Sequence, residues 1–190
     1  MKIAILGWGS LVWDPRNLAI VGDWHQGGPI LPIEFSRKSA NGRLTLVIDP
    51  ANGAPVATRF ARSSLQNLDE AIRNLREREG NPLPNHIGYI NLVKHTERPR
   101  ARQNHPAACD AITVWAREND WEAVIWTALP SNFEAQQHQP FTVQAGLDYL
   151  NGLTGETRAR AFEYIRRAPP ETMTPLRRQF NAMHGENPGN

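Results

Sequence analysis

The stretch that decides the fold prediction is Leu6-Gly7-Trp8-Gly9-Ser10-Leu11-Val12-Trp13-Asp14-Pro15. It overlaps the apolar run at residues 2–7, which is typical of a buried strand, and its glycines favour a tight turn where that strand ends. Consecutive main-chain amides in such a turn can hold a carboxylate or a developing oxyanion. The stretch therefore predicts an opening strand and a ligand-binding turn, and the alternative is a turn without function.

Three β-like runs follow this turn, at residues 30–37, 44–49 and 55–61. The first and second are separated by Asn41-Gly42, and the second and third by Asn52-Gly53. These dipeptides readily adopt positive φ and are typical of hairpin turns. The pattern predicts an antiparallel meander of three strands.

A helix is expected next, because apolar residues recur at a spacing of three or four. We expect Ser63 or Ser64 to cap its start and Gly80 to end it. Its apolar face is formed by Leu65, Leu68, Ile72 and Leu75. Runs rich in β-branched and aromatic residues predict further strands at residues 87–93, 111–116 and 123–129.

The pattern changes to helix from Thr142 onward, and a last helix is expected to start at Thr174-Pro175 with the threonine as its cap. The Arg- and Pro-rich residues 97–106 are expected in a loop. The pattern predicts the α+β class, with an antiparallel sheet that continues past the first helix and further helices after it. We expect one domain over residues 1–183, in which residues 141–183 form a helical C-terminal extension, followed by a flexible tail at 184–190.

The composition narrows the classes of function. A chain of 190 residues with 40% hydrophobic content can form one domain core, and no apolar run reaches the ~20 residues of a membrane span. Its 21 basic and 19 acidic residues give a net charge of +2, which does not predict nucleic-acid binding. The single cysteine, Cys109, suits a cytoplasmic protein. No histidine pair has metal-ligand spacing, so no metal or cofactor is expected, and the oligomeric state stays open.

Glu79 is the candidate catalytic residue. It precedes the expected helix stop at Gly80, where the negative end of the helix dipole disfavours a carboxylate. A glutamate in such a setting suits a group that accepts and returns a proton near neutral pH. The alternative is a structural acid at a helix end, paired with Arg76 or Arg78.

Three segments in order resemble one family. Residues 6–15 resemble the glycine-tyrosine-glycine-serine-leucine-(Ile/Val)-tryptophan opening of ChaC-type γ-glutamylcyclotransferases. Phe35-Ser36-Arg37-Lys38-Ser39, followed by Leu44-Thr45-Leu46-Val47, is similar to the family's next strand pair. Leu75-Arg76-Glu77-Arg78-Glu79-Gly80 lies where the family carries its general acid/base glutamate. The resemblance covers residues 3–80 and fades after about residue 95.

The resemblance implies a mixed, largely antiparallel sheet that is curled toward a barrel and flanked by helices, and an enzyme that needs no cofactor. Its substrate would be a small γ-glutamyl amine or peptide, which such enzymes convert to 5-oxoproline with release of the amine. The implied general acid/base is Glu79; the alternative is Glu77, on another side of the helix, if the register differs by half a turn. The implied substrate-binding residues are Gly7, Trp8, Gly9, Ser10 and Leu11, to which we add Arg37 as a clamp for a carboxylate.

Two features leave alternatives open. Trp8 stands where the family has tyrosine, which removes a hydroxyl and favours a different ligand or a non-catalytic binding or regulatory module. Arg37 is explained equally well by structural pairing with Glu34 or Asp49.

Overall fold

The structure is a computed structural model and describes residues 1–80 and 82–185. Its contacts divide the chain into two compact units. Unit 1 comprises Met1–Leu31 and Ala57–Leu129, and unit 2 comprises Pro32–Val56 and the chain from Pro130 onward. Compactness does not decide whether the units fold independently, so a single domain over residues 1–183 stays a prediction.

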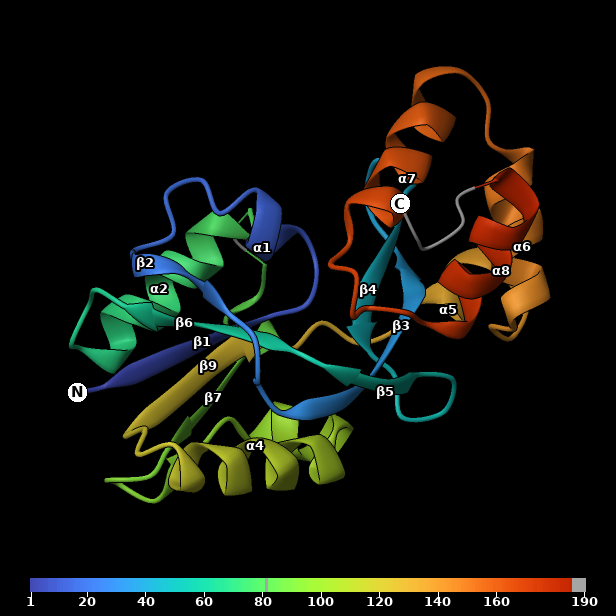
Figure 1. Cartoon of the computed structure of the whole chain (residues 1–190). Coiled ribbons are helices and arrows are strands. Elements are labelled where there is room, and N and C mark those ends of the chain that lie inside the picture. The colour runs from blue at the N-terminus through green and yellow to red at the C-terminus, as the bar shows by residue number, and fades with distance from the viewer. Residues whose placement is uncertain (81, 186–190) are drawn as a thin grey trace. The chain divides into compact units, whose positions relative to one another are not determined.

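A six-stranded sheet forms the centre of unit 1 (Figure 1). Its strands span Ile3–Gly7 (β1), Ile20–His25 (β2), Arg59–Ser63 (β6), Ile87–Asn91 (β7), Thr96–Glu97 (β8) and Ala123–Thr127 (β9). The order is β2-β6-β1-β9-β7-β8; β1 and β9 are parallel, and the other neighbouring pairs are antiparallel. The predicted α+β class with a mixed, largely antiparallel sheet is confirmed. The sheet is open between β2 and β8, so the predicted curl toward a barrel is not confirmed.

Helices cover both faces of this sheet, with α2 on one face and α4 on the other (Figure 1). The helices of unit 1 are Ser10–Trp13 (α1), Leu68–Arg78 (α2), Pro99–Asn104 (α3) and Pro106–Glu118 (α4), with a 3₁₀ helix at Pro84–His86. Ala71 and Leu75 of α2 pack in one buried cluster with Ile3, Ile5 and Ile125 of the sheet. Alternate residues of β1 and β9 therefore face α2.

Unit 2 combines a three-stranded sheet with helices from the C-terminal part of the chain. Its strands are Ile30–Lys38 (β3), Leu44–Ile48 (β4) and Ala54–Ala57 (β5), and its helices are Phe133–Gln137 (α5), Val143–Gly152 (α6), Gly155–Arg167 (α7) and Pro175–His184 (α8). Phe162 of α7 and Phe180 of α8 pack edge to face at 4.8 Å. The predicted cap of the last helix is confirmed, because Thr174 accepts a hydrogen bond from the Arg177 amide at 3.2 Å.

The predicted meander is formed only in its first hairpin. β3 and β4 are antiparallel, and Gly42 in the turn between them has φ of +77°. The sheet order is β4-β3-β5, so β5 pairs with β3 and not with its neighbour in sequence. The run at 55–61 is broken at Thr58, whose hydroxyl donates to the Pro29 carbonyl at 2.8 Å and whose carbonyl accepts from the Gly28 amide. The residues after Thr58 form β6, which pairs with β1.

Two predictions between residues 97 and 116 are wrong. The strand expected at 111–116 lies within α4, because the buried positions recur at helical spacing: Ala108, Cys109, Ile112, Trp115 and Ala116. The loop expected at 97–106 contains the end of β8 and all of α3. Pro99 and Pro106 occupy the first positions of α3 and α4, where a missing amide hydrogen costs nothing.

Two predicted element ends also need correction. Ser63 belongs to β6, and the cap of α2 is Asn67, whose side chain accepts from the amides of Asp69 at 2.9 Å and Glu70 at 3.2 Å. The tail expected at 184–190 begins one residue too early, because His184 is the last residue of α8. Residues 186–190 of that tail lie outside the described residues.

Candidate functional site

Helix α2 runs in the same direction as β1. The last turn of α2 therefore lies near the C-terminal end of β1. Just before α2, the carbonyl of Gln66 accepts a hydrogen bond from the Met1 ammonium at 3.0 Å. At the other end of α2, Arg78 donates to the Ser10 hydroxyl at 3.4 Å and to the Asp14 carbonyl at 2.5 Å. The topology therefore brings the end of α2 and the glycine turn to one corner of unit 1.

Arg78 is a buried cation at this corner. Its side chain is 4% exposed, and its Nη1 lies 2.5 Å from Oε1 of Glu79, whose side chain is 16% exposed. A buried guanidinium requires an anionic or hydrogen-bonding partner, because an unpaired charge is costly to remove from water. The ion pair with Arg78 is the structural alternative that the sequence left open for Glu79. It also links the Glu79 carboxylate, through Arg78, to the Ser10 hydroxyl.

The glycine turn is tight and mostly buried. Gly7 ends β1, Trp8 and Gly9 form a bend, and α1 begins at Ser10. The side chain of Trp8 is 5% exposed, and that of Leu11 packs into the core, so Leu11 can meet a ligand only through its amide. The first amides of a helix have no partner within it. The Val12 amide already donates to the Gly9 carbonyl at 2.9 Å, so the turn offers the Ser10 hydroxyl and the amides of Ser10 and Leu11.

Arg37 belongs to unit 2, whereas the other predicted site residues belong to unit 1. Its guanidinium donates from Nη1 to the Pro130 carbonyl at 2.7 Å. Burial lowers the pKa of Arg37 from its usual value. Within residues 1–80 and 82–185, the expected pairing of Arg37 with Glu34 or Asp49 is not formed. The hydrogen bond from Arg37 to Pro130 connects β3 to the segment before α5.

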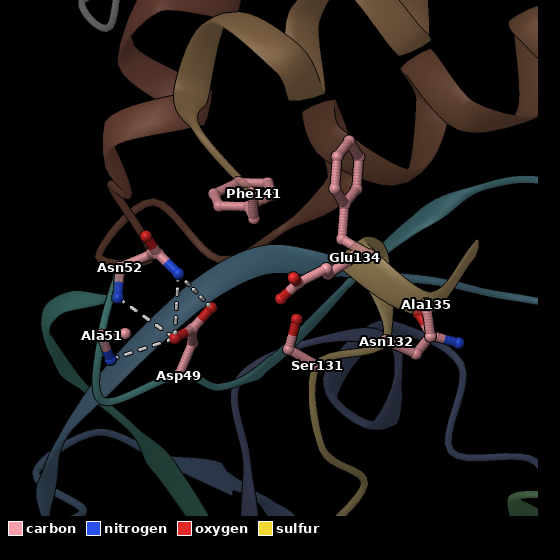
Figure 2. A pocket seen from close by; sticks show the side chains of 9 residues that line it. Asp49, Ala51, Asn52, Ser131, Asn132, Glu134, Ala135 and Phe141 are labelled. Atoms are coloured by element: carbon pink, nitrogen blue, oxygen red, sulfur yellow. Dashed lines mark hydrogen bonds between the residues drawn. The ribbon is translucent and has the colours of Figure 1, made fainter. Parts of the chain in front are cut away.

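A pocket of about 510 Å³ lies in unit 2 and was not predicted from the sequence. Figure 2 shows the oxygen atoms of Asp49, Ser131 and Glu134 around it, with Phe141 on another side. Its lining residues are Asp49, Ala51, Asn52, Ser131, Asn132, Phe133, Glu134, Ala135 and Phe141.

Two of these oxygen-bearing side chains are already bonded within the chain. The Asp49 carboxylate accepts from the amides of Ala51 and Asn52 at 3.1 Å and from the Asn52 side chain. The Ser131 hydroxyl donates to the Ser36 carbonyl at 2.7 Å. These bonds stabilise the turn after β4 and the segment before α5. Because Asp49 and Ser131 already have structural partners, the corner of unit 1 is a stronger candidate site than this pocket.

The described part of the chain contains neither a metal-binding cluster nor a helix that could span a membrane. No three His, Cys, Asp or Glu side chains gather closely enough there to hold a metal ion. No helix among the described residues combines the length and the apolar character that crossing a membrane requires.

The comparisons with known proteins identify no family. No protein-family model, curated protein or solved structure matches this chain. The similarity to γ-glutamylcyclotransferases therefore depends on the three sequence segments alone.

Proposed function

We propose that the chain is a γ-glutamylcyclotransferase-like enzyme that closes a γ-glutamyl group to 5-oxoproline and releases the attached amine. The observation that carries this proposal is that the Glu79 carboxylate and the glycine turn lie at the same corner of unit 1. Arg78 connects them, because it donates hydrogen bonds to both Glu79 and Ser10. The proposal includes the family's barrel-like curl of the sheet and a cytoplasmic location. Arg37 as a carboxylate clamp is not part of it, because its guanidinium is bonded to Pro130.

The reaction asks little of the protein beyond positioning and proton transfer. The α-amine of the substrate attacks its own γ-carbonyl carbon, so a carbon–nitrogen bond forms in the ring and the bond to the leaving amine breaks. The attacking ammonium becomes the N–H of the ring and so loses two protons: Glu79 accepts one and returns it to the leaving nitrogen, and the other passes to solvent. The turn amides and the Ser10 hydroxyl stabilise the charge that develops on the carbonyl oxygen.

Arg78 has a definite role in this scheme. It holds the Glu79 carboxylate at 2.5 Å and donates to Ser10 and Asp14 on the other side. A base fixed in this way keeps one orientation, and this reduces the entropy lost on reaching the reactive geometry. Only Oε1 of Glu79 is engaged by Arg78, so Oε2 is the oxygen that exchanges protons with the substrate.

The test is a 5-oxoproline assay with γ-glutamyl amino acids, γ-glutamylamines and glutathione as substrates. Glu79→Gln should lower turnover at least about 100-fold, because the amide neither accepts nor returns the proton. Glu77→Gln is the matched control, since Glu77 is an exposed residue of the same helix and should turn over like the unmodified protein. Absence of 5-oxoproline with every substrate, or full turnover by Glu79→Gln, would overturn the proposal.

A second candidate function is a non-catalytic module that binds a small molecule. The short ion pair between Glu79 and Arg78 favours it, because a carboxylate held by a buried cation suits a structural role. This module would bind glutamate or 5-oxoproline in a calorimetric titration and form no product from any substrate. Its Glu79→Gln variant would lose stability, because Arg78 would be left buried without its charged partner.

A further inference from the structure

Thr127, the last residue of β9, carries a hydroxyl that no group in the described part of the chain satisfies. Its Oγ1 is buried from solvent and has no hydrogen-bond partner there. Buried polar groups in proteins are nearly always hydrogen-bonded, so each exception calls for an explanation. The position of Thr127 in the sheet supplies one.

The hydroxyl lies beside the glycine turn. β1 and β9 are parallel neighbours of five residues each, and they pair in register from Ile3 with Ala123 to Ile5 with Ile125. Continued for two more residues, this register places Gly7 beside Thr127, which are the last residues of the two strands. Side chains on a strand alternate between the faces, so Thr127 shares the face of Ile125, which is the face that packs against α2. The Thr127 hydroxyl therefore faces the side of the sheet whose corner holds Glu79.

Trp24 covers Gly7, the last residue of the strand beside Thr127. A β-carbon built on Gly7 would lie 2.7 and 2.8 Å from Cζ3 and Cη2 of Trp24, so the indole lies over Gly7 only because this residue has no side chain. The indole Nε1 of Trp24 is also buried and without a hydrogen-bond partner among the described residues. An indole N–H is only a donor, and a threonine hydroxyl can donate. The two unpaired groups can therefore both donate, and they suit a hydrogen-bond acceptor such as a carboxylate.

We propose that Thr127 and Trp24 bind the α-carboxylate of the amino-acid head group, and so select substrates in which this carboxylate is free. The choice of ligand rests on the proposed function, which supplies the γ-glutamyl substrate. The turn amides and the Ser10 hydroxyl then serve the reacting carbonyl, and Glu79 serves the amine. Each part of the substrate has its own set of partners in unit 1.

The test is calorimetric titration of L-glutamate into the full chain and its variants, together with the 5-oxoproline assay. Thr127→Val removes the hydroxyl and keeps the shape, and it should weaken glutamate binding about 10- to 100-fold, as the loss of a hydrogen bond to a charged group does. Thr127→Ser keeps the hydroxyl and should bind glutamate like the unmodified protein. Trp24→Phe removes the indole N–H and should weaken binding. L-glutamate amidated at its α-carboxylate should bind weakly, with the same affinity to the unmodified protein and to Thr127→Val.

If the hydroxyl served only to stabilise the fold, its removal in Thr127→Val would lower the unfolding temperature. Since Oγ1 bonds to nothing in the described chain, Thr127→Val should unfold at the same temperature as the unmodified protein or higher. Equal glutamate affinity in Thr127→Val, or no glutamate binding by the unmodified protein, would overturn this inference. Glutamate binding that depends on Thr127 without any 5-oxoproline production would support it and overturn the proposed reaction.

Discussion

Glu34 is a fully buried carboxyl held by uncharged donors. One oxygen accepts from its neighbour's amide, that of Phe35, at 2.7 Å, and the other accepts from the Leu176 amide at 3.2 Å near the start of α8. Burial raises the pKa of Glu34, and the nearby Asp49 adds to the rise, whereas the hydrogen bonds from Thr174, Phe35 and Leu176 oppose it. Burial has the largest effect because it removes the carboxylate from water.

This raised pKa makes the stability of the protein depend on pH. The folded state favours the protonated form of Glu34, so its contribution is complete below the usual pKa of 4.5 and is lost as the pH rises through the higher folded value. Each unit by which the folded pKa exceeds the unfolded one is worth about 1.4 kcal/mol. The unfolding free energy of the unmodified protein minus that of Glu34→Gln should therefore fall from pH 4 to pH 8 in urea titrations. Glu118→Gln, which removes an exposed carboxyl, is the control, and a difference that grows with pH would contradict the expectation.

Helix α2 can be weakened at one end without touching the other. Asn67→Ala removes the hydrogen bonds to the amides of Asp69 and Glu70, and it should lower the free energy of unfolding by about 1 kcal/mol. In the proposed reaction Glu79 acts at the opposite end of the helix, so turnover per folded molecule in that reaction should not change. Urea unfolding and the 5-oxoproline assay measure the two effects, and Asn67→Ser should keep most of the stability. A fall in turnover in a fully folded Asn67→Ala protein would show that the cap influences the site.

The elements predicted well from the sequence were those whose pattern and end signals agree. For α8, Thr174 and Pro175 are a cap and a first-position proline, and the structure confirms both. The strand expected at 111–116 failed because β-branched and aromatic residues outweighed the helical spacing of the longer segment 106–118. The two prolines at 99 and 106 favour a loop by composition, although proline is equally suited to start a helix.

The residues of the candidate site also divide into those with a clear local signal in the sequence and those without one. The glycine turn and Glu79 stand out locally. The sequence offers Arg76 or Arg78 as the partner of that acid, and the structure forms the pair with Arg78. Thr127 carries no local signal, because its importance comes from the parallel pairing of β1 with β9, which are more than a hundred residues apart in the chain. Arg37 resembled a ligand clamp, yet its partner Pro130 lies 93 residues away. Contacts of this kind depend on the order of the strands, which residue patterns do not determine.

The distribution of tryptophan allows a test of whether the two units unfold together. The chain has 6 tryptophans, and all of them lie in unit 1: Trp8, Trp13, Trp24, Trp115, Trp121 and Trp126. The chain passes between the units inside β3 and inside β5, so loss of unit 2 would release strand residues that belong to unit 1. We therefore expect one cooperative transition, in agreement with the single domain predicted over residues 1–183.

Phe180→Leu tests this expectation from within unit 2. Phe180 is fully buried and packs edge to face on Phe162 at 4.8 Å, so the smaller side chain should lower the free energy of unfolding by roughly 1 to 3 kcal/mol. In urea, tryptophan fluorescence should report the same loss as circular dichroism at 222 nm, although the substitution lies in the unit without tryptophan. A fluorescence midpoint that stays in place while the dichroism curve divides into two steps would mean that unit 1 folds alone. The candidate site, which lies wholly in unit 1, would then be expected to survive the loss of unit 2.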